Sequence, residues 1–178
     1  MERDPIFDTE AITQWSYDIG LFGFMNSQWG WPVIESLHFL GLSLLLGTVG
    51  LFDLRMLGFA KSFSLRALHA FIPFGVAGFV LNLVTGSMFV LSAPAQYLHN
   101  PAFQLKFTCL MIAGLNMVVF YRVSAASVLQ VGPTQRVPMA ARAFAVVSLA
   151  AWIGVITFGR LLTFFRPPYH WCAWCGLG

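Results

Sequence analysis

The sequence predicts an all-α integral membrane protein: a four-helix bundle preceded by a short interfacial helix. Only 10% of the 178 residues are Asp, Glu, Lys or Arg, whereas roughly a quarter are charged in ordinary soluble domains. Apolar residues make up 58% of the chain, too many for a surface that faces water. They concentrate in four stretches of about 20 residues, the length that crosses a hydrocarbon core.

Residues 1–32 are predicted to form an N-terminal arm at the membrane surface. Four apolar residues of this arm recur at helical spacing: Ile12, Trp15, Ile19 and Phe22. We expect this amphipathic helix to lie in the interface, with an ordinary packed surface helix as the alternative. The acidic start lacks the basic and apolar regions of a cleavable signal peptide, so the first span is expected to insert by itself.

The bundle is predicted over residues 33–162. Its four spans are residues 33–52, 70–90, 102–121 and 143–162. Each is ~30 Å long as a helix, and only helices satisfy the backbone of such isolated spans in lipid. Asn100 and Pro101 are typical of a helix N-cap and first turn. Residues 163–178 are an aromatic tail that contains cysteines.

Charge predicts the orientation of the bundle. Six basic residues flank the two loops on one side: Arg55, Lys61, Arg66, Arg122, Arg136 and Arg142. The positive-inside rule assigns this side to the cytoplasm. We therefore expect a multi-pass protein of the bacterial inner membrane with both termini in the periplasm. Five tryptophans on the predicted outer side would form an interfacial belt: Trp15, Trp29, Trp31, Trp171 and Trp174.

Ionisable residues inside the spans are the candidate functional residues. At 1.5 Å per residue, Glu35 and His38 lie roughly 12 and 8 Å to the outer side of the midplane. Met88, Lys106 and Arg160 lie at a similar depth, about 9 to 12 Å. An ionisable side chain at such depth costs about 2.5–3.5 kcal/mol. We therefore expect these side chains to face the bundle interior and to find partners.

One interpretation of this layer is a haem b site for electron transfer. His38 is the candidate axial ligand, and Lys106 or Arg160 would neutralise a propionate. The second ligand is either Met88 or His99, the latter if its loop dips inward. A third histidine, His69, begins the second span at the other end, about 25 Å away by the same arithmetic, and is too distant to share one iron.

Two alternatives stay open for the same layer. Glu35 and His38 are three residues apart on one helix face, so they are candidate ligands of copper or another metal. Glu-x-x-His occurs once in this chain, whereas di-iron bundles need it twice. The structural alternative is an ion pair between Glu35 and Arg160, with His38 as a hydrogen-bonded interior residue.

The tail contains a C-x-x-C motif, Cys172 and Cys175, on the predicted oxidising side. A structural disulfide or unmodified thiols are the plain interpretation, and redox chemistry or metal binding is the alternative. The motif lacks the following histidine of c-type haem attachment. Cys109, in the third span, is expected to pack as a small hydrophobe.

Four ordered motifs carry a resemblance to a known family. They are Ile34–Gly41 with Glu35 and His38, Asp53–Gly58, Asn100–Lys106 and Gly159–Leu162. Together they resemble a bacterial family of four-helix inner-membrane proteins classed as a domain of unknown function, from Trp15 to Phe165. The first motif is also distantly similar to copper resistance protein D-type domains and cytochrome b-like bundles. The resemblance implies a fold and a membrane location, and it assigns no activity.

The sequence favours a small subunit of a larger membrane assembly over an enzyme. No Gly-rich phosphate loop, nucleophile elbow, H-E-x-x-H motif or paired catalytic carboxylates are present. The hypotheses are a b-type electron carrier, a non-catalytic assembly subunit, and a copper- or metal-handling protein. Expected partners are other membrane subunits, further copies of the chain and lipid. Nucleic acid is not expected, because ten Lys and Arg give no dense basic stripe.

Overall fold

Helices account for all regular secondary structure in the described part of the chain, which confirms the predicted all-α class. The computed structural model describes residues 8–132 and 135–164. Four of its helical segments are long and apolar enough to cross a membrane, as expected of a multi-pass membrane protein. They are α3 (Gly30–Leu57), α4 (Leu65–His69) with α5 (Ile72–Ser92), α7 (Pro101–Val123) and α9 (Met139–Leu161).

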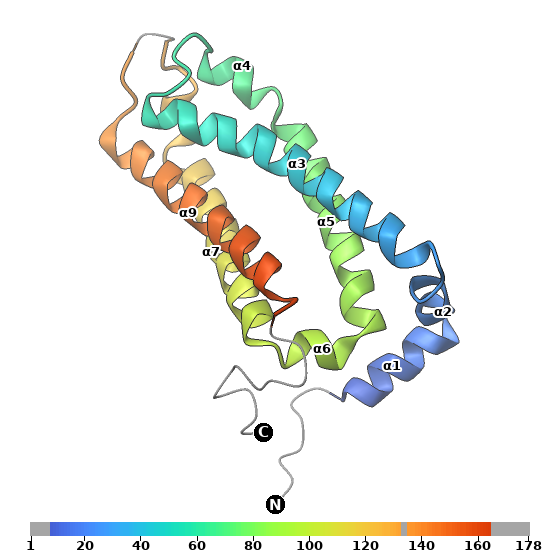
Figure 1. Ribbon diagram of the computed structural model, residues 1–178. Coiled ribbons are helices and arrows are strands. Elements are labelled where there is room, and N and C mark those ends of the chain that lie inside the picture. The colour runs from blue at the N-terminus through green and yellow to red at the C-terminus, as the bar shows by residue number, and fades with distance from the viewer. Residues whose placement is uncertain (1–7, 133–134, 165–178) are drawn as a thin grey trace, which may run out of the picture.

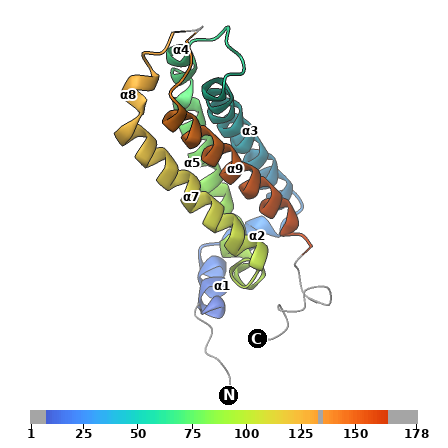
Figure 2. The same cartoon turned by 90° about the vertical axis from the view of Figure 1, so that its left-hand side faces the viewer.

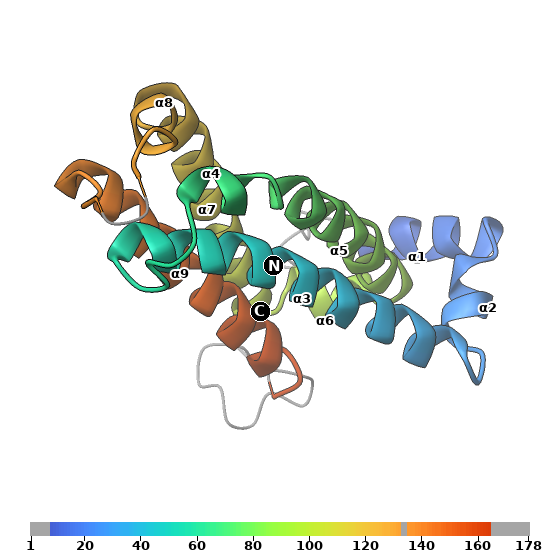
Figure 3. The same cartoon turned by 90° about the horizontal axis from the view of Figure 1, so that it is seen from above.

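The long helices are arranged as two packed pairs. Helix α3 packs along α5, and α7 packs along α9 (Figures 1 and 2). The pairs meet where α3 crosses α9, so that α3 lies between α5 and α9 in the view from above (Figure 3). Helices α5 and α7 have few backbone contacts with each other, so they are the most widely separated neighbours of the bundle.

The two ends of the bundle differ in the elements that cover them. One end has α4 and the short helix α8 (Ala125–Val128), and the basic loop residues gather there. We call it the arginine-rich end. The opposite end has α1 (Thr9–Asp18), α2 (Leu21–Met25) and α6 (Pro94–Leu98), and we call it the α1/α6 end.

The N-terminal arm forms two short helices where the sequence predicts one. Asp8 caps α1 by accepting a 2.9 Å hydrogen bond from the Ala11 N–H. Gly20 separates α1 from α2 because it adopts a φ of 74°, in the left-handed region that favours glycine. The predicted cap of the third span is confirmed, since the Asn100 side chain accepts a 2.9 Å hydrogen bond from the Ala102 N–H.

Helix α3 continues past both ends of its predicted span. The predicted span ends at Phe52, before the next charged residue. The helix continues through two buried charged residues, Asp53 and Arg55. The guanidinium of Arg55 donates to the backbone carbonyls of Phe63 (2.8 Å) and Gly132 (3.2 Å). These loop carbonyls give the buried cation hydrogen-bond partners, which makes its position inside the protein tolerable.

Small residues let the paired helices approach closely. Gly41 of α3 and Gly78 of α5 lie at the crossing, where a Cβ on Gly78 would be 2.5 Å from the Gly41 carbonyl oxygen. In the other pair, a Cβ on Gly154 of α9 would be 2.6 Å from the Cys109 Sγ. Cys109 is a free, half-buried thiol, and it packs against this helix as a small hydrophobe would.

Candidate functional site

His38 is held on α5 by hydrogen bonding at one nitrogen of its ring. Its Nδ1 lies 2.8 Å from the hydroxyl oxygen of Thr85. That hydroxyl also donates to the Leu81 carbonyl at 2.7 Å. In the orientation that satisfies its hydrogen bonds, the Asn82 amide nitrogen lies 3.2 Å from the same Nδ1. Both contacts are made at Nδ1, and no described residue bonds to Nε2. The ring also contacts Phe89 edge-on, with the two ring centroids 5.8 Å apart.

Lys106 lies on the opposite helix pair, at the same end of the bundle. Its half-buried side chain runs over Gly159 of α9, where an added Cβ would be 3.6 Å from the ammonium nitrogen. The structure thus places the predicted histidine and lysine at the same end of the bundle, on different helix pairs.

The other predicted residues of this layer do not join them. Glu35 is exposed and forms no hydrogen bond or ion pair with any described residue. Arg160 is exposed on the last turn of α9, and no ion pair links it to Glu35. His99 is exposed at the end of α6. Met88 is half-buried against an apolar cluster at the α1/α6 end.

No cluster of three or more His, Cys, Asp or Glu residues is present within residues 8–132 and 135–164. The predicted pair of metal ligands, Glu35 and His38, therefore gains no third such residue there. Cys172 and Cys175 lie outside the described residues, so their proposed disulfide, redox or metal chemistry stays a prediction.

His69 belongs to a different part of the protein. It lies at the end of α4, where its Nε2 is 3.0 Å from the Tyr121 hydroxyl of α7. Its ring also packs against Phe52, with the centroids 6.1 Å apart. This pairing links α4 to α7 at the arginine-rich end, where α4 and α7 contribute to one apolar cluster.

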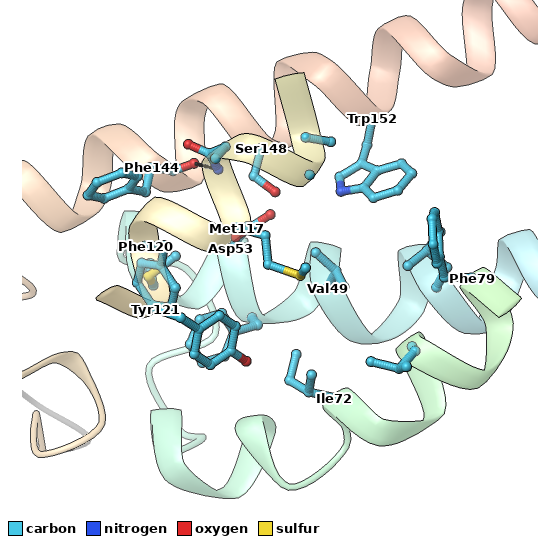
Figure 4. A pocket seen from close by; sticks show the side chains of 18 of the residues that line it. Val49, Asp53, Ile72, Phe79, Met117, Phe120, Tyr121, Phe144, Ser148 and Trp152 are labelled. Carbon is cyan, nitrogen blue, oxygen red and sulfur yellow. Dashed lines mark hydrogen bonds between the residues drawn. The ribbon is translucent and has the colours of Figure 1, made fainter. Parts of the chain in front are cut away.

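A cavity between the four long helices is a feature that the sequence analysis missed. It has a volume of about 200 Å³ and is lined by α3, α5, α7 and α9 (Figure 4). Its wall includes Asp53, which is 3% exposed, together with Asn116 and Ser148. The Asp53 carboxyl group has the Ser148 side chain as a hydrogen-bonding neighbour, and its Oδ2 is buried without a partner.

The helical spacing of residues before Asp53 could have indicated that this aspartate faces the bundle interior. Leu45, Val49 and Asp53 follow one another at intervals of four residues, so they share one face of a helix. Ending the predicted span at Phe52 placed Asp53 in a loop, where a carboxylate needs no explanation. The signal was therefore an apolar face that continues through a charged residue.

Comparison of the chain with protein-family models, with curated proteins and with solved structures gives no match.

Proposed function

We propose that this protein is a small membrane subunit that binds haem b at His38 and carries electrons within a larger membrane assembly. The supporting observation is the hydrogen bond between His38 Nδ1 and Thr85. Histidines that ligate metals commonly hydrogen-bond through their other ring nitrogen, which fixes the ring orientation. Nε2, to which no described residue bonds, is the nitrogen that a haem iron would take.

The residues around His38 suit this role. Thr85 would hold the imidazole in place, and Phe89 would restrict its rotation by packing against the ring edge. The ammonium of Lys106 would balance a propionate. The second ligand stays a prediction from the sequence, Met88 or His99; Met88 packs in the apolar cluster at the α1/α6 end, and His99 is exposed at the end of α6. A haem supplies reversible one-electron chemistry at its iron when bound.

The visible absorption spectrum of the purified protein tests this proposal. We expect a Soret band in the wild type and its loss in H38A. T85V, which removes the hydroxyl partner of Nδ1, should bind haem about 10- to 100-fold more weakly, as is typical for loss of such a supporting partner. H69A is the matched control, because His69 is bonded to a tyrosine at the other end of the bundle. A wild type without a Soret band after growth with excess haem contradicts the proposal, as does an unchanged spectrum in H38A.

A non-catalytic assembly subunit is the second candidate function. Its support is the small share of each spanning helix that is buried, from 11% to 28% of the most apolar window. The rest is apolar surface, open to lipid, to another subunit or to a second copy. Cross-linking in native membranes followed by purification tests this candidate: a specific cross-linked chain supports it, and a monomer without partners counts against it.

Metal analysis of the same sample tests the copper alternative at His38.

A further inference from the structure

We propose that the central cavity binds a small, lipid-soluble organic amine, with the Asp53 carboxylate as its anchor. This site is separate from His38, which lies toward the α1/α6 end, and it does not depend on haem binding. Three features carry the proposal: the unpartnered carboxylate oxygen, the aromatic lining and the position of the opening.

The carboxylate is the first feature. Asp53 is 3% exposed, and no described residue donates to its Oδ2. No ion pair links Asp53 to a described basic residue; Arg55, two residues further along α3, donates instead to the Phe63 and Gly132 carbonyls. Buried carboxyl groups in proteins are as a rule fully hydrogen-bonded and, when ionised, paired with a cation. Asp53 lies in the wall of the cavity, beside Ser148 in Figure 4.

The lining is the second feature. Six aromatic side chains surround the space: Phe52, Phe79, Phe120, Tyr121, Phe144 and Trp152. Aromatic faces attract organic cations through the ring quadrupole, and this attraction grows when the cation is desolvated. A carboxylate beside aromatic rings therefore favours an ammonium group on an apolar body. A metal ion fits poorly, because it needs several oxygen or nitrogen ligands.

The size of the cavity limits the ligand to about one ring. An engineered apolar cavity of roughly 150 Å³ is large enough to bind benzene. The volume here is about 200 Å³, which leaves room for one ring with a short aminoalkyl group.

The opening is the third feature, and it indicates how the ligand enters. Val76 of α5 and Met117 of α7 both line the cavity, and each is 52% exposed at the outer surface of the bundle. These two helices have few backbone contacts with each other. In a membrane this mouth faces hydrocarbon, so the ligand must enter from the bilayer as a neutral amine. It then takes up a proton, which the Asp53 carboxyl group can supply, so that an ammonium–carboxylate pair is formed.

Benzylamine binding to the purified full-length protein in detergent tests the proposal. We expect saturable binding, measured by calorimetry, that weakens at least tenfold in D53N. E35Q is the matched control, since it removes an exposed carboxylate at the other end of α3 and should bind benzylamine as the wild type does. V76W should slow association by narrowing the mouth. Absence of saturable binding to the wild type overturns the proposal, and so does equal affinity in D53N.

A second measurement keeps the test decisive if D53N does not fold. In the wild type, benzylamine should bind at least tenfold more tightly than toluene, which has the ring without the amine. Equal or weaker binding of benzylamine overturns the role of the carboxylate. H38A separates this site from the proposed haem site: amine binding should be unchanged in H38A even if the Soret band is lost.

Discussion

At the scale of single residues, the buried polar groups define what each part of the bundle can do. His38 and Asp53 lie on the same helix, yet their surroundings differ. His38 has a hydroxyl partner that leaves one nitrogen free to bind a ligand. Asp53 has a carboxylate oxygen without a partner, in an aromatic cavity. The first arrangement suits coordination of a metal centre, and the second suits an ion pair with an organic cation.

Arg55 gives the clearest stability prediction at this scale. It is 1% exposed and ties α3 to two loop carbonyls, so R55M should leave both carbonyls without their donor. We expect a loss of about 1.5–3 kcal/mol in the free energy of unfolding, the contribution typical of a hydrogen bond to a charged group. Thermal unfolding in detergent measures it. R66M is the control, because Arg66 is exposed on α4. Equal melting temperatures for the two variants would contradict this role of Arg55.

The position of a side chain along its helix could be predicted from the sequence, but the direction in which it points around the helix axis could not. Spacing at 1.5 Å per residue correctly placed His38 and Lys106 at one end of the bundle. The same arithmetic suggested a partner for Glu35, which the structure leaves exposed. Which face of a helix points inward depends on the packing of the other helices. In this chain the long helices are apolar nearly all round, so the pattern of apolar residues gives little information about that face.

At the scale of elements, apolar runs predicted the four spans, and tertiary contacts decided their ends and their pairing. Helix α3 extends beyond Phe52 because loop carbonyls supply partners for Arg55. Nothing in the sequence indicated that α5 and α7 would be separated. The pairing of the helices depends on close approaches at particular glycines, such as Gly41 and Gly78. The positions of the predicted spans do not reveal these approaches.

The crossing of α3 and α5 can be tested with one methyl group. In G78A the new Cβ would meet the Gly41 carbonyl oxygen and the Leu44 Cβ, at 2.5 and 2.9 Å. Overpacking of this kind costs about 1–3 kcal/mol, so the melting temperature should fall. G47A is the matched control on α3, where a Cβ meets nothing within 4 Å. Removing a helical glycine there should leave stability unchanged or raise it by up to about 1 kcal/mol. A similar effect of both substitutions would contradict the close crossing.

At the scale of the whole molecule, charge is distributed unevenly between the two ends. The basic residues of the loops gather at the arginine-rich end, around α4 and α8, whereas Asp8, Glu10 and Asp18 lie in or beside α1 at the other end. The positive-inside rule then predicts a cytoplasmic location for the arginine-rich end.

Cysteine labelling tests that orientation. In a background with the three native cysteines replaced by serine, Q28C places a thiol at the α1/α6 end and S62C places one in the loop at the arginine-rich end; both positions are exposed. A membrane-impermeant maleimide added to intact spheroplasts should label Q28C and spare S62C. After lysis both should react, which controls for intrinsic accessibility. Labelling of S62C alone before lysis would reverse the predicted topology.

The wide separation of α5 and α7 also has a mechanical consequence. The two helix pairs share an apolar cluster at the arginine-rich end, so the easiest motion between them is a change in the angle between the pairs. His38 and Lys106 lie on different pairs, so their separation changes with that angle. The separation of Val76 and Met117 changes in the same way.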